Sequence, residues 1–157
     1  KEKVEMLHRL MARETGGAVG LRDGILLDSA LNSIFQTFDG KELYPTVEEK
    51  GARLGFNLIS NHAFVDGNKR IGMLVMMTSL EINGIRIGCA DEDIIEIALG
   101  VASGKTIYKG LLDWVRRHGC SYLQSGQEQM KQGEQGFISG SSLLPIPLPK
   151  AAFQRSD

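Results

Sequence analysis

One stretch of the chain, from His62 to Arg70, gathers side chains that could do chemistry together. It holds an imidazole, a carboxylate, a glycine, an amide and two cations, at His62, Asp66, Gly67, Asn68, Lys69 and Arg70. An imidazole can accept a proton at neutral pH, and a carboxylate oxygen is a preferred ligand of Mg²⁺. Cations and backbone amides can hold phosphate oxygens. These residue types indicate a site that handles phosphate.

Apolar residues recur at helical spacing on both sides of this stretch. They predict one helix from about residue 47 to residue 61 and a second helix directly after the stretch. The stretch is then a loop that enters a helix N-terminus, where exposed amides and the positive end of the dipole bind anions. Gly67 and Asn68 are predicted to hold phosphate through their amides, and Lys69 and Arg70 to neutralise it.

The same residues also allow a plainer interpretation. Asp66 and Gly67 form a common turn pair. A single histidine at the start of a helix, here His62, is more often structural than catalytic. Residue types alone therefore leave a phosphate site and an ordinary interhelix turn both open.

The spacing of the stretch favours the first interpretation, because it closely resembles the signature of the Fic/Doc family. That signature is His-x-Phe-x-Asp/Glu-Gly-Asn-x-Arg, and its specified positions are present as His62, Phe64, Asp66, Gly67, Asn68 and Arg70. A second run, Leu21-Arg22-Asp23 followed by residues 26–31, resembles the amino-terminal signature of death-on-curing toxins. The resemblance covers most of residues 3–118.

Three positions separate the branches of that family. Lys69 before Arg70 resembles the Doc branch, and Ala63 stands where many Fic proteins have proline. Met73 stands where the AMP-transferring members carry a second arginine, which orients the triphosphate. The resemblance therefore implies a Doc-like toxin that transfers the γ-phosphate of ATP to a Ser/Thr hydroxyl of a target protein, such as a translation factor. A Fic-type AMP transferase and a catalytically silent binding module are the alternatives.

The resemblance also implies roles for the loop residues. His62 would be the general base, Asp66 the Mg²⁺ contact, and Phe64 a core residue that pins the loop. The implied fold is an all-α bundle of about six helices with a small β-hairpin flap, placed at residues 36–46, which would lie over the active site and pair with the target segment. No Ser/Thr-x-x-x-Glu-Gly/Asn self-inhibitory pattern is found, so we expect an antitoxin to act in trans. The groove of this chain that binds the antitoxin is expected on the first helix, at Leu7, Leu10 and Met11.

Further elements follow from periodicity and turn residues. A first helix should end at Gly16–Gly17, where glycine can take a left-handed cap, and its His8 is interpreted as a surface or groove histidine. A second should span residues 26–35, entered through a turn in which Arg22 has a structural role. After the motif helix, which should be the buried core, Asn83–Gly84 is a stop and residues 85–87 a short strand. Two more helices are expected, capped by Asp91 and Thr106, the last ending with Arg116, Arg117 and His118.

Composition limits the remaining possibilities. The chain has 157 residues, 42% of them hydrophobic, and a formal net charge of -1, so we expect one domain and no direct nucleic-acid binding. Two cysteines and three histidines are scattered without zinc or disulfide spacing. With no membrane span or signal peptide expected, a cytoplasmic location is predicted. The predicted domain is 1–119, followed by a low-complexity Gly/Ser/Gln/Pro tail over 120–157.

Overall fold

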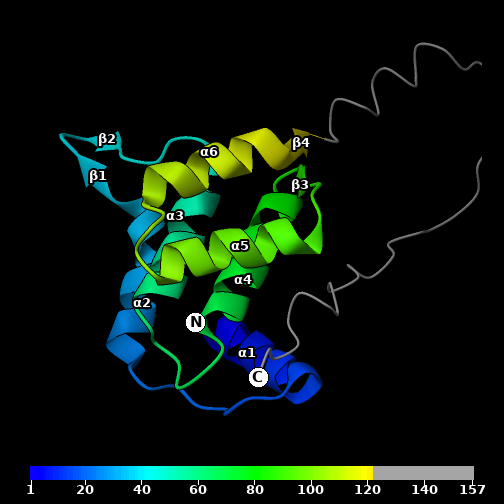
Figure 1. Ribbon diagram of the computed structural model, residues 1–157. Helices are drawn as coiled ribbons and strands as arrows, with labels where there is room; N and C mark the ends of the chain where they lie inside the picture. The colour runs from blue at the N-terminus through cyan, green and yellow to red at the C-terminus, as the bar shows by residue number, and fades with distance from the viewer. Residues whose placement is uncertain (122–157) are drawn as a thin grey trace, which may run out of the picture.

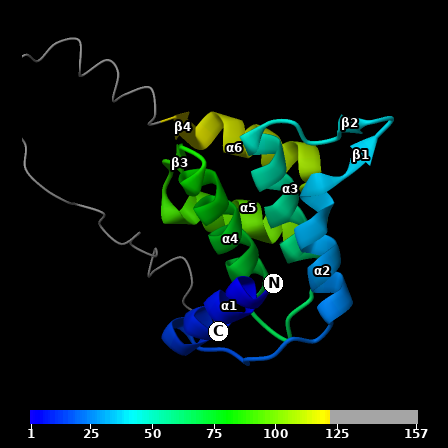
Figure 2. The ribbon, with the colours of Figure 1, turned by 180° about the vertical axis from the view of Figure 1, so that it is seen from behind.

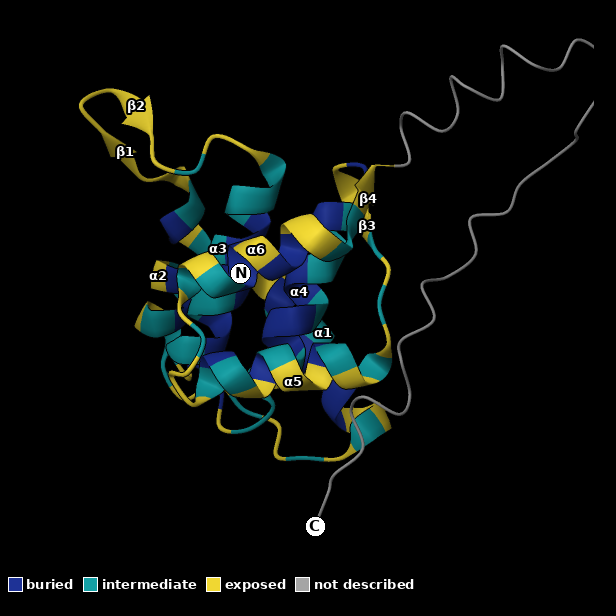
Figure 3. Ribbon diagram, turned by 45° about the horizontal axis from the view of Figure 1, so that its top comes forward, coloured by how far each residue is buried: buried dark blue, intermediate teal, exposed yellow. Residues whose placement is uncertain are grey.

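Helices α3 (Val47–Ser60) and α4 (Asn68–Ile82) lie side by side at the centre of the computed structural model, which describes residues 1–121 (Figure 1). Glycine lets the two helices approach closely. A Cβ atom on Gly55 would lie 2.8 Å from the sulfur of Met76, which is too close for a packed core. Much of α4 is buried, as Figure 3 shows, so the expected core helix is confirmed.

Helices α1 (Glu2–Thr15) and α2 (Gly24–Asn32) cover one side of this pair, and α2 continues into a 3₁₀ turn over Ser33–Phe35. The Asp23 carboxylate caps α2 by accepting hydrogen bonds from two first-turn amides, at 2.9 and 3.1 Å. Buried residues of these helices, of α3, of the motif loop and of α4 form what we call the motif-side core: Val4, Met11, Leu27, Ala30, Leu54, Leu58, Ala63, Phe64, Ile71 and Val75.

Helices α5 (Asp91–Ala102) and α6 (Tyr108–His118) cover the other side. Here the buried residues form a second cluster, which we call the carboxy-terminal core: Ala52, Ile59, Met73, Met76, Leu80, Ile94, Ala98, Val101, Leu111, Leu112, Trp114 and Val115. Strand β3 (Ile85–Ile87) forms as expected and pairs antiparallel with β4 (Gly119–Ser121), with Arg86 opposite Cys120. The sequence did not predict that partner strand.

A small antiparallel hairpin also forms, from β1 (Thr37–Phe38) and β2 (Lys41–Glu42). Its two turn residues both have positive φ, as a tight hairpin turn requires. The hairpin lies at the start of α3, however, whereas the motif loop follows the end of α3 (Figures 1 and 2). A helix of 14 residues separates them by about 21 Å. The expectation that this hairpin lies over the active site is therefore wrong.

Three helix ends differ from those predicted. Asp91 is the first residue of α5 and not its cap, and the Asp93 carboxylate accepts the amide of Ala90 at 3.3 Å. Thr106 does not cap α6, which starts after Ile107. The turn at Gly16 has positive φ, but its ψ of 163° is extended, so α1 ends without the expected left-handed cap.

Over residues 1–121 the fold is all-α, with six helices and the small hairpin, and this fold class is confirmed. No helix in that part of the chain combines the length and hydropathy needed to cross a membrane. The predicted tail begins within β4, and from residue 122 onward it lies outside the described residues.

Candidate active site

The loop between α3 and α4 presents His62 in an unusual backbone conformation. Its φ is +50°, which costs a residue with a side chain about 1–3 kcal/mol. The residue is also exposed, in contrast to its neighbour Ala63, which is fully buried. Such strain persists where surrounding contacts hold it, and it is concentrated at functional sites. An exposed imidazole can reach a hydroxyl on another molecule, as a general base must.

Phe64 and Asn68 fix the shape of this loop. The Asn68 side-chain oxygen accepts the Phe64 amide, and its amide nitrogen donates to the Phe64 carbonyl, both at 2.9 Å. Phe64 is 2% exposed, so the prediction that it points into the core is confirmed. The side chain of Asn68 is thus committed to the loop. Its predicted phosphate contact, through the backbone amide in the first turn of α4, remains a prediction.

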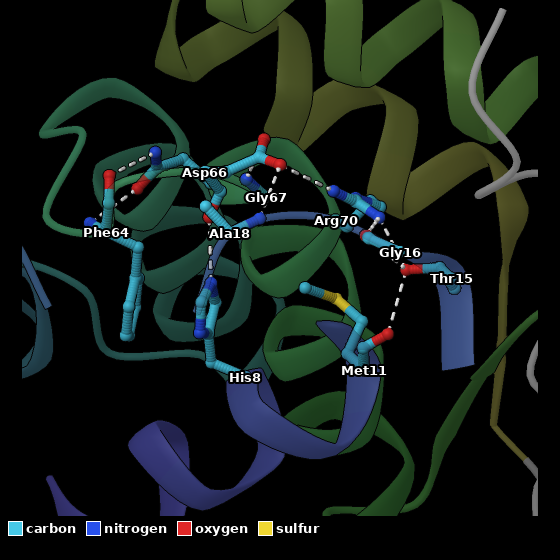
Figure 4. A network of polar contacts seen from close by, with 10 residues as sticks. His8, Met11, Thr15, Gly16, Ala18, Phe64, Asp66, Gly67 and Arg70 are labelled. Carbon is cyan, nitrogen blue, oxygen red and sulfur yellow. Dashed lines mark hydrogen bonds and ion pairs between the residues drawn. The ribbon is translucent and has the colours of Figure 1, made fainter. Parts of the chain in front are cut away.

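The Asp66 carboxylate is oriented by backbone amides and a cation. Its Oδ1 accepts the Gly67 amide at 2.6 Å, and its Oδ2 accepts the Ala18 amide at 3.3 Å (Figure 4). The Arg70 guanidinium lies 3.5 Å from Oδ2. In this arrangement the Gly67 amide, predicted to hold phosphate, donates to Asp66. Gly67 adopts the left-handed conformation as the residue before α4, which only glycine takes readily.

The two predicted phosphate-neutralising cations are placed differently. Lys69 is exposed, whereas the Arg70 side chain is only 15% exposed. Arg70 donates to the hydroxyl of Thr15 and, at 2.9 Å, to the carbonyl of Gly16 (Figure 4). A cation is favoured there because the last backbone carbonyls of α1 form the negative end of its dipole. Arg70 therefore connects the C-terminus of α1 to Asp66.

A magnesium ion fits this carboxylate. Within residues 1–121 no three His, Cys, Asp or Glu side chains converge as a metal cage, so Asp66 would act alone. Mg²⁺ is commonly held by one or two carboxylates together with nucleotide phosphates and water. The carboxylate is 39% exposed, which leaves room for such ligands.

Residues 16–23, and not the hairpin, cross the motif loop. Leu21 forms an antiparallel bridge with Phe64, and the Val65 amide donates to the Gly20 carbonyl at 3.0 Å. The amide of Arg22 donates to the Ala63 carbonyl at 2.8 Å. The structural role predicted for Arg22 is therefore carried by its backbone amide, while its side chain is exposed. Figure 2 shows this blue segment beside the green motif loop.

His8 is placed where the sequence prediction did not expect it. It is 2% exposed, so its interpretation as a surface or groove histidine is wrong. Its ring stacks on Phe64 with centroids 4.1 Å apart, and its Nε2 lies 2.8 Å from the Asp66 carbonyl oxygen. A signal was present in the sequence, because Val4, His8 and Met11 share one face of a helix at spacings of four and three.

The expected groove residues on α1 divide between inside and outside. Met11 is 5% exposed and belongs to the motif-side core, so it cannot line an open groove. Leu7 is half-buried, while Leu10 is 48% and Met6 50% exposed. The outer face of α1 is thus apolar at Met6 and Leu10.

Met73 lies fully buried in the carboxy-terminal core. It packs with residues of α5 and α6, and both it and Met76 fill space in that core. The position of the second family arginine is therefore apolar and enclosed in this chain. The Met73 side chain itself carries no charge that could orient a triphosphate.

Comparison with known proteins agrees with the geometry of the loop. Residues 1–80, which include the whole motif, match the Fic/DOC family. A relative named Toxin Doc, from Mycolicibacterium smegmatis, is 42% identical over 79 residues, which are 50% of this chain and 60% of that protein. The chain thus spans about three fifths of the length of that relative. With half of its residues matched to the family, this chain belongs to the Fic/DOC family.

Proposed function

We propose that this chain is the toxin of a toxin–antitoxin pair and transfers the γ-phosphate of ATP to a serine or threonine hydroxyl of a target protein. A translation factor is the class of target that we expect. The observation that carries the proposal is one loop at the N-terminus of α4 with an exposed imidazole, an oriented carboxylate and two cations. Family membership and the similarity to Toxin Doc support it.

His62 acts as the general base in this reaction. Its ring takes the proton of the target hydroxyl while the hydroxyl oxygen bonds to the γ-phosphorus. The bond from the γ-phosphorus to the bridging oxygen breaks, so ADP leaves and the target carries a phosphate ester. The exposure of His62 suits a base whose substrate arrives from solution.

The other loop residues hold the nucleotide. Asp66 would bind Mg²⁺, which supplies neutralisation of the phosphate oxygens when bound. The exposed Lys69 side chain can reach those oxygens from solvent. The Arg70 guanidinium lies 3.5 Å from the Asp66 carboxylate, so it can exchange one of its contacts at the C-terminus of α1 for a contact with a phosphate oxygen. The amide of Asn68 at the start of α4 would complete the phosphate site, while the Gly67 amide donates to the Asp66 carboxylate.

The choice of the γ-phosphate rests on Met73. A transferase that moves AMP must hold the triphosphate so that the α-phosphate faces the base, and the family does this with a second arginine. Here that position is a buried methionine within an apolar core. The cations that remain, Lys69 and Arg70, are both at the first turn of α4.

Residues 16–23 are the candidate site for the target segment. They already make strand-like hydrogen bonds to the motif loop, and Val19 and Leu21 are 53% and 39% exposed. A target chain in extended form would add to this segment by backbone pairing. The hydroxyl would then be delivered beside His62.

Mass spectrometry of a translation-factor target incubated with the chain, ATP and Mg²⁺ tests the proposal. A gain of one phosphate on a serine or threonine is expected with the wild type and not with His62→Ala. A gain of AMP would replace the kinase by an AMP transferase. Calorimetry with a non-hydrolysable ATP analogue and Mg²⁺ tests the third possibility, because a silent binding module would take up no nucleotide.

A further inference from the structure

His8 contacts the motif loop from the inner face of α1. Figure 4 shows its ring reaching from the helix toward the backbone of Asp66, with the Phe64 ring beside it. The Nε2 atom lies 2.8 Å from the Asp66 carbonyl oxygen, and the rings of His8 and Phe64 are nearly parallel, at 10°. Because a carbonyl oxygen can only accept a hydrogen bond, Nε2 must carry the hydrogen.

This hydrogen bond fixes the carbonyl end of the Asp66–Gly67 peptide plane, and the amide end of the same plane donates to the Asp66 carboxylate. The Asp66 carbonyl and the Gly67 amide belong to one planar peptide unit and point in opposite directions. The Gly67 amide donates to Asp66 Oδ1 at 2.6 Å. Rotation of the peptide plane would therefore move the donor on which the Asp66 carboxylate rests.

Packing leaves this peptide with little alternative. A Cβ atom on Gly67 would lie 3.0 Å from Met11 and 3.5 Å from His8 Nε2, so α1 lies directly against the turn. His8 itself is 2% exposed. A carbonyl in such a place needs a protein donor, because water cannot readily supply one.

We propose that His8 is a positioning residue that sets the orientation of the Asp66 carboxylate through the Asp66–Gly67 peptide. It does not contact the substrate. The inference rests on the proposed role of Asp66 in Mg²⁺ and nucleotide binding, and it assigns to α1 a direct part in the geometry of the site. Groups that orient a metal ligand commonly change metal affinity or activity by about 10–100-fold when they are removed.

Two substitutions separate the hydrogen bond from the packing. His8→Phe keeps a flat ring against Phe64 but removes the donor, whereas His8→Gln can place an amide N–H near the position of Nε2. Val4→Ala is the matched control, because it removes buried volume from the same face of α1, one turn away from His8, and leaves the His8 hydrogen bond in place. For each variant, kcat and KM for transfer, Mg²⁺-dependent binding of an ATP analogue, and hydrogen exchange of the Gly67 amide are measured.

We expect His8→Phe to lower kcat and the apparent Mg²⁺ affinity by about tenfold or more and to speed exchange of the Gly67 amide. His8→Gln should recover most of both losses, and Val4→Ala should lower the melting temperature without changing kcat or the exchange of Gly67. Unchanged exchange and unchanged Mg²⁺-dependent binding in a folded His8→Phe protein overturn the inference. If the wild type neither binds nucleotide nor transfers phosphate, the proposed function fails, and the exchange of Gly67 still tests the contact.

A measurement on the wild type covers the case in which His8→Phe does not fold. Nitrogen-15 spectra of the imidazoles report which ring nitrogen carries hydrogen. A hydrogen on Nε2 of His8 that exchanges slowly with water supports the contact. A ring with hydrogen on Nδ1 alone contradicts it.

Discussion

The two sides of α4 are built on different principles. On the side of α1, apolar packing is combined with polar contacts to the motif loop, through His8, Thr15 and Arg70. On the side of α5 and α6, the buried face of α4 is apolar and includes Met73, Met76 and Leu80. The α1 side thus holds the strained backbone and the polar side chains of the motif loop in place, while the side of α5 and α6 contributes apolar packing. The comparison predicts that substitutions on the two sides affect different properties.

The largest difference between loss of activity and loss of stability is expected at His62, the strained residue at the start of the loop. His62→Ala removes the proposed base, so transfer should fall by about 10²-fold or more. The melting temperature should stay near that of the wild type, because the exposed imidazole contributes little packing. Nucleotide affinity, measured by calorimetry, should also persist. A variant that transfers phosphate at the wild-type rate would remove His62 from the mechanism.

The opposite pattern is expected in the carboxy-terminal core. Met76 is fully buried between α3 and α4, and Met76→Ala should lower the free energy of unfolding by about 2–5 kcal/mol. Urea unfolding measures this change. The fraction that remains folded should transfer phosphate with a wild-type kcat, because no residue of the motif loop belongs to the core that Met76 joins. A large loss of kcat without a loss of stability would contradict the division between the two sides.

Asp66→Asn tests whether the polar side binds metal or only holds structure. The amide keeps the size of the carboxylate but removes its charge, so Mg²⁺-dependent nucleotide binding should weaken by about tenfold or more. Isothermal calorimetry at several Mg²⁺ concentrations gives the affinity. Unchanged dependence on magnesium would leave Asp66 as a structural acceptor for the amides of Ala18 and Gly67.

The sequence predicted the structure of the loop better than that of its surroundings. The apolar periodicity on both sides of the motif was sufficient to predict a loop entering a helix, and the family resemblance implied a buried Phe64. Which face of α1 is buried was harder to predict. His8 is polar, and its burial depends on a carbonyl 58 positions along the chain that accepts its hydrogen bond. Periodicity alone does not reveal such a partner.

The hairpin shows a different limit, because its place in the chain was predicted correctly but its place relative to the motif was not. The hairpin was predicted at residues 36–46, and its turn lies within that range at Asp39–Gly40. Its distance from the motif was implied by the length of α3, since a helix of 14 residues separates its two ends by about 21 Å. The pairing of β3 with β4 could not be inferred in the same way, because it joins strands that α5 and α6 separate in the chain.

A smaller difference is expected on the outer surfaces of the two sides. Leu10 on α1 and Leu99 on α5 are 48% and 50% exposed, so each can be changed to glutamate with little effect on folding. If the antitoxin binds beside α1, Leu10→Glu should weaken neutralisation in a growth assay while toxicity remains. Leu99→Glu should be neutralised like the wild type. Equal neutralisation of both variants would place the antitoxin groove elsewhere.

The smallest effect is expected in the response of the α6 side to alkaline pH. Burial, and then the negative charge of Glu49, raise the pKa of Tyr108 to about 12, and its hydroxyl donates to the Glu49 carbonyl at 3.3 Å. Because folding raises this pKa, the contribution of Tyr108 to stability is fully present below about pH 10 and is lost as pH rises toward 12.

The free energy of unfolding should therefore decline between pH 10 and pH 12 more steeply in the wild type than in Tyr108→Phe, which has no phenol to titrate. Urea unfolding followed by circular dichroism across that range measures the difference. Below pH 9 the two curves should run parallel, separated only by the lost hydrogen bond to Glu49. If they stay parallel up to pH 12, partial burial and Glu49 do not raise the pKa of the Tyr108 phenol, and the contrast between the two sides of α4 is weaker than the core residues indicate.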